Sequence, residues 1–149
     1  MKGTIVAALN RATEEQLAGH LHACDAGFLP RLSTRVNIGH YAQKMIRHAT
    51  RFEAWAADEL AGLVAMYCND RAAEAAFITN VSVLPDWQGH NIATDLVARS
   101  IDHAWARGIK CIKLSVHKDN APALAIYRKL GFTDETCVED TRELRLCRT

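Results

Sequence analysis

A short polar loop between an apolar run and an amphipathic run is the feature that most constrains this chain. Residues 77–104 read FITNVSVLPDWQGHNIATDLVARSIDHA. The stretch from Phe77 to Leu84 has the composition of a buried strand, and the stretch from Ile92 to Arg107 has the apolar spacing of a helix. A helix that begins just after a strand turns its free N–H groups and the positive end of its dipole into the loop, where they favour an anion such as phosphate.

The loop PDWQGHN contains two residues that suit such a site. Gly89 allows a ligand to approach the backbone closely, and Asn91 can adopt left-handed backbone angles at modest cost. The phosphate-binding patterns G-x-x-x-x-G-K-[ST] and G-x-G-x-x-G do not occur, which argues against nucleotide hydrolysis and dinucleotide binding. Taken alone, the loop could also be a plain turn.

The remaining periodicity predicts one α/β domain over residues 1–149. Its second half has the order β-α-β-α-β, so part of the sheet should be parallel. We expect a mixed central sheet of about seven strands flanked by about four helices. Besides the elements above, we expect strands at Thr4–Leu9, Arg51–Ala56, Leu60–Cys68 and 110–117, and two more strands from Thr133 on. We also expect helices that begin at Thr13, where Thr13 and Gln16 form a capping-box pattern, at Ile38 and after Asn120.

Composition bounds the partners and the compartment. The net charge of +1 gives no indication of a nucleic-acid partner, and no apolar run is long enough for a signal peptide or a membrane span. The five cysteines, 24, 68, 111, 137 and 147, are odd in number and widely spaced, which argues against a disulfide framework and a zinc site. The seven histidines include no H-E-x-x-H, so no metal is expected. We expect a cytoplasmic monomer or homodimer.

A second segment, LSVHKDNAPALAIYRKLGF, adds polar residues at defined positions. Asn120 precedes a helix and Pro122 falls in its first turn, as is typical of a helix N-terminus. Tyr127 follows Asn120 by seven residues and therefore lies on nearly the same face. The tyrosine is either a core residue with one hydrogen-bond partner or a residue whose hydroxyl faces the same cleft as the Gln88–Ala93 loop.

Together the two segments resemble the GNAT superfamily of acyl-CoA-dependent N-acyltransferases. The loop Gln88-Gly89-His90-Asn91-Ile92-Ala93 is similar to the family pattern Q/R-x-x-G-x-G/A, with Asn91 where glycine is usual. The pattern L-x-V-x-x-x-N-x-x-A-x-x-x-Y-x-x-x-G-F is matched throughout from Leu114 to Phe132, and Val83-Leu84-Pro85 lies where the family commonly has V-x-P. The resemblance covers a little over a third of the chain.

The resemblance implies acetyl-CoA as co-substrate. Its pantetheine arm would insert beside the splayed strand like an added strand, its pyrophosphate would rest on loop amides, and Asn120 would contact the arm. Tyr127 would lie near the sulfur and give a proton to the departing thiolate. The residues expected to hold acetyl-CoA are Val81, Ser82, Val83, Gln88, Gly89, His90, Asn91, Ile92, Ala93, Thr94, Asn120 and Tyr127.

The reaction would be direct acetyl transfer to a primary amine, which must first lose a proton to a base. Many members carry a glutamate on the splayed strand, whereas Ala75–Leu84 contains no carboxylate. Asn80, helped by Thr79 and Ser82, could hold a water there. The more distant candidates for the base are Glu53, Glu74, His40 and His117.

The acceptor should bind between the first two helices and the loop that joins them. We expect a small amine, either neutral or anionic and of amino-sugar or amino-acid type, in contact with Phe28, Arg31, Arg35 and Tyr41. The two arginines could instead be solvated loop charges. The missing strand carboxylate leaves an alternative function, a non-catalytic acyl-CoA-binding module that regulates a partner protein. A nucleotide-binding protein of another kind is a third possibility.

Overall fold

The computed structural model describes residues 3–68 and 75–149, and in them seven strands form one mixed sheet in the order β1-β2-β3-β4-β5-β7-β6. The predicted α/β fold is confirmed, with most boundaries within two residues. The strands are β1 (Ile5–Leu9), β2 (Ala49–Ala56), β3 (Glu59–Tyr67), β4 (Ala75–Val83), β5 (Cys111–His117), β6 (Thr133–Val138) and β7 (Thr141–Cys147), and the helices are α1 (Glu14–Cys24), α2 (Ile38–His48), α3 (Ile92–Ala106) and α4 (Ala121–Lys129).

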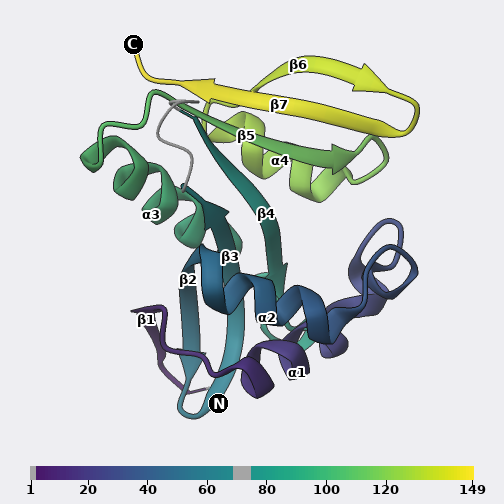
Figure 1. The fold of residues 1–149 in the computed structure, drawn as a ribbon, viewed down its shortest axis with the longest axis vertical. Helices are drawn as coiled ribbons and strands as arrows, with labels where there is room; N and C mark the ends of the chain where they lie inside the picture. Colours follow the sequence, from purple (N-terminus) through teal and green to yellow (C-terminus); the bar gives the residue numbers. More distant parts are fainter. Residues whose placement is uncertain (1–2, 69–74) are drawn as a thin grey trace.

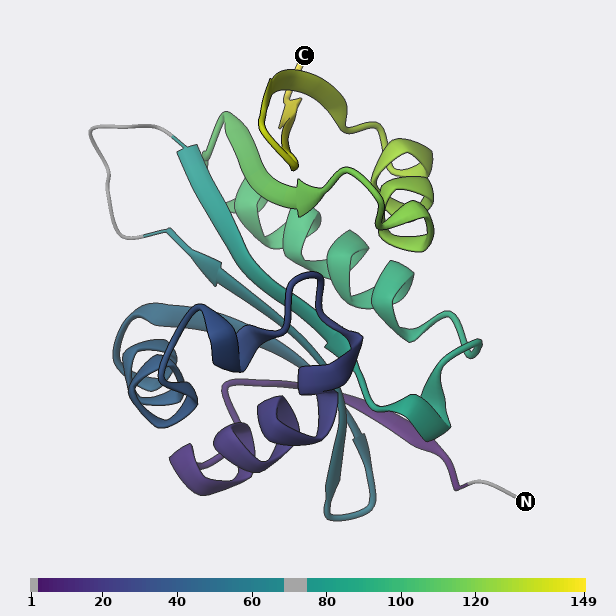
Figure 2. The same cartoon turned by 90° about the vertical axis from the view of Figure 1, so that its right-hand side faces the viewer.

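The helices cover both faces of the sheet. Helices α1 and α2 lie on one face and α3 on the other, with α4 in the same hydrophobic cluster as α3 (Figure 2). Side chains alternate between the two faces of strand β3, and both faces are apolar. Leu63 and Ala65 pack with α1 and α2, while Val64 and Met66 pack in the cluster that contains α3.

Side chains fix where three of the helices begin. Thr13 and Gln16 form the predicted capping box, with reciprocal bonds of 2.9 and 3.2 Å between side chain and backbone. Asn37 caps α2 by accepting the His40 N–H at 3.0 Å. Asn120 caps α4 by accepting the Ala123 N–H at 3.3 Å. Between α1 and α2, residues 28–37 form the predicted connection, which contains a short 3-10 turn, Leu32–Thr34.

Strands β4 and β5 separate part of the way along. They pair in parallel only from Ala75–Ile78 against Cys111–Leu114, although both strands continue (Figure 1). At the point of separation the β3–β4 register shifts, because Ala65 faces Asn80 while Met66 faces Ile78. Thr79 is therefore the extra residue of a β-bulge, a feature that bends a strand and ends its regular pairing. The bulge opens the sheet between the ends of β4 and β5.

One prediction about the cysteines is wrong. Cys111 and Cys147 form a disulfide, although no disulfide framework was expected. The two residues lie directly opposite each other where β5 and β7 pair antiparallel, a register that their separation of 36 residues does not reveal. This pair therefore contradicts the inference that the number and spacing of the cysteines exclude a disulfide. Among the described residues, no helix is both long and apolar enough to cross a membrane.

Candidate active site

The loop before α3 is a tight, left-handed turn. Gly89 has φ +83° and Asn91 has φ +63°, so asparagine does adopt the left-handed conformation expected for it. The His90 side chain folds back onto this loop, where its Nδ1 lies 3.1 Å from the carbonyl oxygens of both Trp87 and Gln88. The His90 side chain thereby braces the loop from within.

The N-terminus of α3 offers unpaired backbone donors. The first α-helical bond of the segment runs from the Asp95 N–H to the Asn91 carbonyl at 3.1 Å, and the Asn91 side chain caps nothing. The N–H groups of residues 92–94 therefore have no acceptor within the part of the chain that the structure describes. They stand at the positive end of a 15-residue helix, the arrangement that binds phosphate.

A cavity of about 650 Å³ extends from this helix end along β4 to α4. Every residue predicted to hold acetyl-CoA lines it except His90, which is turned to the loop carbonyls. Strand β4 contributes Val81, Ser82 and Val83 to the same cavity. Since β5 pairs with β4 only as far as Ile78, the main-chain groups on this edge of β4 have no partner in β5.

A second cavity, of about 380 Å³, lies beside the connection between α1 and α2. Phe28 and Arg35 line it, as predicted for acceptor-binding residues. Arg31 and Tyr41 do not line it. Arg31 is exposed on the connecting loop, and the Tyr41 hydroxyl is 2.8 Å from both the carbonyl oxygen and Oγ1 of Thr79. Tyr41 therefore holds the bulge of β4.

The two cavities meet at three residues that line both, Val81, Asn120 and Tyr127. Tyr127 is 6% exposed, and its ring makes an edge contact with Phe132 at 5.9 Å between centroids. Within residues 3–68 and 75–149 no hydrogen bond to its hydroxyl contributes to its pKa, which reflects burial alone. Burial raises the pKa of Tyr127 above its ordinary value of 10.0, so the hydroxyl keeps its proton at neutral pH.

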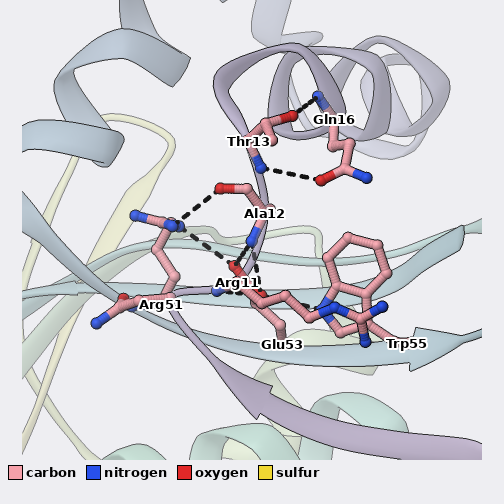
Figure 3. Close-up of polar contacts among 8 residues, drawn as sticks. Arg11, Ala12, Thr13, Gln16, Arg51, Glu53 and Trp55 are labelled. Atoms are coloured by element: carbon pink, nitrogen blue, oxygen red, sulfur yellow. Dashed lines mark hydrogen bonds and ion pairs between the residues drawn. The ribbon is translucent and has the colours of Figure 1, made fainter. Parts of the chain in front are cut away.

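Glu53 is a structural residue and not a base in this cleft (Figure 3). Its carboxylate is fully buried and accepts the backbone N–H groups of Arg11 and Ala12, at 2.9 and 3.1 Å. It also accepts the Trp55 indole N–H at 3.0 Å and the Arg51 Nε–H at 3.2 Å. These donors join β2 to the segment that leads into α1 and occupy the carboxylate completely.

The other predicted bases are placed differently. His40 is exposed in the first turn of α2. His117 lines the second cavity, but its Nδ1 accepts the Asp119 N–H at 3.1 Å. Glu74 lies outside the described residues. Nowhere in the described ranges do three or more His, Cys, Asp or Glu side chains gather to hold a metal ion.

His20 on α1 is a polar residue of the cleft that sequence reasoning missed. Its Nδ1 lies 2.9 Å from the Leu60 carbonyl oxygen and its Nε2 2.9 Å from Ser82 Oγ. Ser82 Oγ in turn lies 2.8 Å from Oδ1 of Asn80. The available signal was its position, since His20 falls in the apolar stripe of Leu17, Leu21 and Cys24 at i, i+3, i+4 and i+7.

The fold and the cleft together define a class of protein. A model of the acetyltransferase (GNAT) family matches residues 13–132, and the chain belongs to this family. A Bacillus subtilis acetyltransferase in complex with CoA superposes with a TM-score of 0.76 at 19% identity, over 98% of this chain and 100% of that one. The Escherichia coli ribosomal-protein-S18-alanine N-acetyltransferase superposes with a TM-score of 0.76 at 18% identity, over 97% and 94%. At these identities the likeness demonstrates the fold.

Two relatives match at higher identity over shorter segments. A mycothiol acetyltransferase of Saccharomonospora viridis is 47% identical over 60 residues, 40% of this chain and 20% of that protein. The Escherichia coli K12 ribosomal protein bS18-alanine N-acetyltransferase is 35% identical over 63 residues, 42% of this chain and 43% of that protein. The matched segment thus spans less than half the length of either relative.

Proposed function

We propose that the protein is an acetyl-CoA-dependent N-acetyltransferase that transfers the acetyl group directly to a primary amine. The observation that carries this proposal is the meeting of two cavities at Val81, Asn120 and Tyr127, one of which ends on the unpaired N–H groups of α3. Membership of the GNAT family and the CoA complex of the Bacillus subtilis structure support the choice of co-substrate.

We propose a partner in the cleft for each part of the co-substrate. The pyrophosphate would accept N–H groups of residues 92–94, and the pantetheine arm would pair with the edge of β4 that β5 leaves free. A main-chain N–H near Val81 would stabilise the oxyanion of the tetrahedral intermediate. Tyr127 would protonate the thiolate as the C–S bond breaks.

The acceptor that fits the second cavity best is a small amine of amino-acid or amino-sugar type. Arg35 on one wall suits a carboxylate or phosphate of the acceptor, while Glu139 and Asp140 on another wall suit its ammonium group. The two relatives are named as a mycothiol acetyltransferase and a ribosomal protein bS18-alanine N-acetyltransferase, so a peptide N-terminus belongs in the same screen.

A regulatory acyl-CoA-binding module is the second candidate function. The observation that favours it is the composition of β4, where Ala75–Val83 contains no carboxylate that could act as the usual base. Calorimetry with acetyl-CoA, followed by thiol release over a panel of amines, separates the two functions. The panel comprises alanine, glutamate, glucosamine, glucosamine phosphate, spermidine and an alanine-initiated tripeptide. Tight binding without acceptor-dependent thiol release would favour the regulatory module and contradict the enzyme.

The phosphate-binding role of the loop is tested by Gly89→Asp. The added carboxylate would repel the pyrophosphate, and the φ of +83° would strain any side chain at this position. Gly108→Asp is the matched control, because Gly108 has φ +79° at the opposite end of α3. We expect both variants to lose similar stability and only Gly89→Asp to lose acetyl-CoA binding in calorimetry. Normal binding by folded Gly89→Asp would refute the assignment.

A further inference from the structure

A buried hydrogen-bonded chain connects His20 to the candidate cleft. His20 is 4% exposed and is held between the Leu60 carbonyl and Ser82 Oγ, each at 2.9 Å. Ser82 lines the larger cavity, and Asn80, at 2.8 Å from Ser82 Oγ, lines the smaller one. The chain therefore reaches the cleft on both sides of Val81, where the two cavities meet.

The direction of these hydrogen bonds is set by the Leu60 carbonyl. A carbonyl oxygen can only accept, so Nδ1 of His20 carries a hydrogen and Nε2 of the neutral ring is an acceptor. In the structure the Ser82 hydroxyl donates to Asn80 Oδ1 at 2.8 Å, an arrangement that suits a protonated ring whose Nε2–H donates to Ser82 Oγ. When the ring is neutral, the Ser82 hydroxyl turns to donate to Nε2, and the Asn80 amide turns to offer an N–H to Ser82 Oγ. Rotation of one hydroxyl and one amide thus accommodates both protonation states.

A hollow separate from the two cleft cavities brings two carboxylates near His20. This hollow, of about 220 Å³, is lined by His20, Gln16, Asp58 and Glu59, of which the last three are exposed. His20 therefore separates the cleft from a second solvent-facing surface that carries two carboxylates. Such carboxylates favour an imidazolium.

The remaining groups around His20 leave it as the base of the cluster. Burial lowers the pKa of His20 below its ordinary value of 6.5, and the hydrogen bond to the Leu60 carbonyl and the charges of Glu53 and Glu59 oppose this only partly, so the ring is neutral at pH 7. Cys24 Sγ lies 3.7 Å from Nε2, but burial raises the pKa of this thiol to about 11 and keeps it protonated. His20 is thus neutral and able to accept a proton.

We infer that His20 receives the acceptor's proton through Ser82, and that it is the base absent from β4. This inference rests on the proposed acetyltransferase function. The ammonium group of the acceptor gives a proton to Ser82 Oγ while the Ser82 hydroxyl proton moves to His20 Nε2. The neutral amine then attacks the thioester carbonyl and forms the C–N bond, the C–S bond breaks, and the thiolate takes the Tyr127 hydroxyl proton. The proton that the attacking nitrogen still carries passes to water, which reprotonates Tyr127. After the product leaves, Nε2–H of His20 returns its proton through Ser82 to water in the cleft, and the ring is again the Nδ1–H tautomer.

Nuclear magnetic resonance tests the starting state without an acceptor. The ring nitrogen shifts of His20 at pH 7 should be those of the neutral Nδ1–H tautomer, and Ser82→Ala should alter the Nε2 shift. The resonance is assigned by its loss in His20→Gln. A neutral Nε2–H tautomer would overturn the relay, since that nitrogen could not accept a proton from Ser82.

Kinetics test the relay itself, with the panel amine that releases thiol fastest. In His20→Gln the amide oxygen can still accept from Ser82 but cannot take a proton. We expect kcat/KM at pH 7 to fall about 100-fold, the lower end of general-base effects. The deficit should shrink as the pH rises through the pKa of the chosen amine, about 8 for a peptide N-terminus and about 10 for a lysine-like amine, because the acceptor then arrives already neutral. Ser82→Ala should reproduce this pattern, and His22→Gln, which changes an exposed residue on the same helix, should not.

The outcomes separate the relay from the function on which it rests. A deficit that is the same at every pH would assign His20 a structural role, and full activity at pH 7 in both variants would refute the relay. If the wild-type protein released no thiol with any amine of the panel, the proposed function itself would be refuted.

Discussion

Glu53→Gln should cost this protein a large part of its stability. Both oxygens of the buried carboxylate accept hydrogen bonds (Figure 3). Oε1 accepts from Arg11, Ala12 and Trp55. Oε2 accepts from Ala12 at 3.1 Å and from Arg51 at 3.2 Å. In glutamine the amide oxygen can serve only one of these positions. The amide N–H₂ would then face N–H donors, and the Arg51 charge would stay buried without a counter-charge.

The magnitude follows from the burial of both partners. The side chains of Arg51 and Glu53 are 5% and 0% exposed. Removal of one member of a buried ion pair typically costs about 3–5 kcal/mol, against a total free energy of unfolding of about 5–15 kcal/mol. Asp95→Asn is the matched control, since Asp95 and Arg99 form an ion pair whose side chains are 53% and 54% exposed. The same chemical change there should cost at most about 0.5 kcal/mol.

Urea unfolding followed by circular dichroism measures both variants. Adding Arg51→Met to Glu53→Gln should recover part of the loss, because the uncompensated charge is then removed. A loss below about 1 kcal/mol in Glu53→Gln would refute the account of the buried pair. Thiol release per folded molecule should be unchanged, whereas a specific loss of kcat would return Glu53 to consideration as a base.

Three further predictions concern other parts of the chain. Tyr127→Phe should lower kcat about 100-fold with little change in acetyl-CoA affinity; unchanged kcat with a lower melting temperature would make the hydroxyl structural. Because burial lowers the pKa of His20, the unfolded chain takes up a proton at higher pH than the folded chain. The free energy of unfolding should fall as the pH drops through 6.5, and urea titrations should show a smaller fall in His20→Gln; an equal fall would contradict this. Peptide mapping should find Cys111 linked to Cys147, and reduction should cost about 2–4 kcal/mol in urea unfolding; no change on reduction would refute it.

Local sequence patterns were sufficient to predict much of the fold and the conformation of the loop before α3. The capping box of Thr13 and Gln16 and the left-handed Asn91 depend on neighbours in sequence, so the sequence alone could predict them. The strand–loop–helix junction is likewise local. Its placement against Asn120 and Tyr127 followed from a resemblance, because no local rule brings the start of α4 to the start of α3.

The features that sequence reasoning missed depend on contacts across the sheet. Strict alternation puts Ile78, Asn80 and Ser82 on one face, whereas the bulge turns the two polar residues toward α1 and α2. The role of Glu53 depends on amides that lie 41 and 42 residues away. The pairing of Cys111 with Cys147 required the register of β5 and β7.

Thr79 has a consequence for attempts to improve this protein. A chain without it would keep Asn80, Val81 and Ser82 on their present faces, and β4 could run straight and continue to pair with β5 beyond Ile78. Such a sheet would gain main-chain hydrogen bonds and lose its opening. A library selected on melting temperature alone would therefore favour deletion of Thr79, and the yield of acetylated product would reveal what the gain in stability had removed.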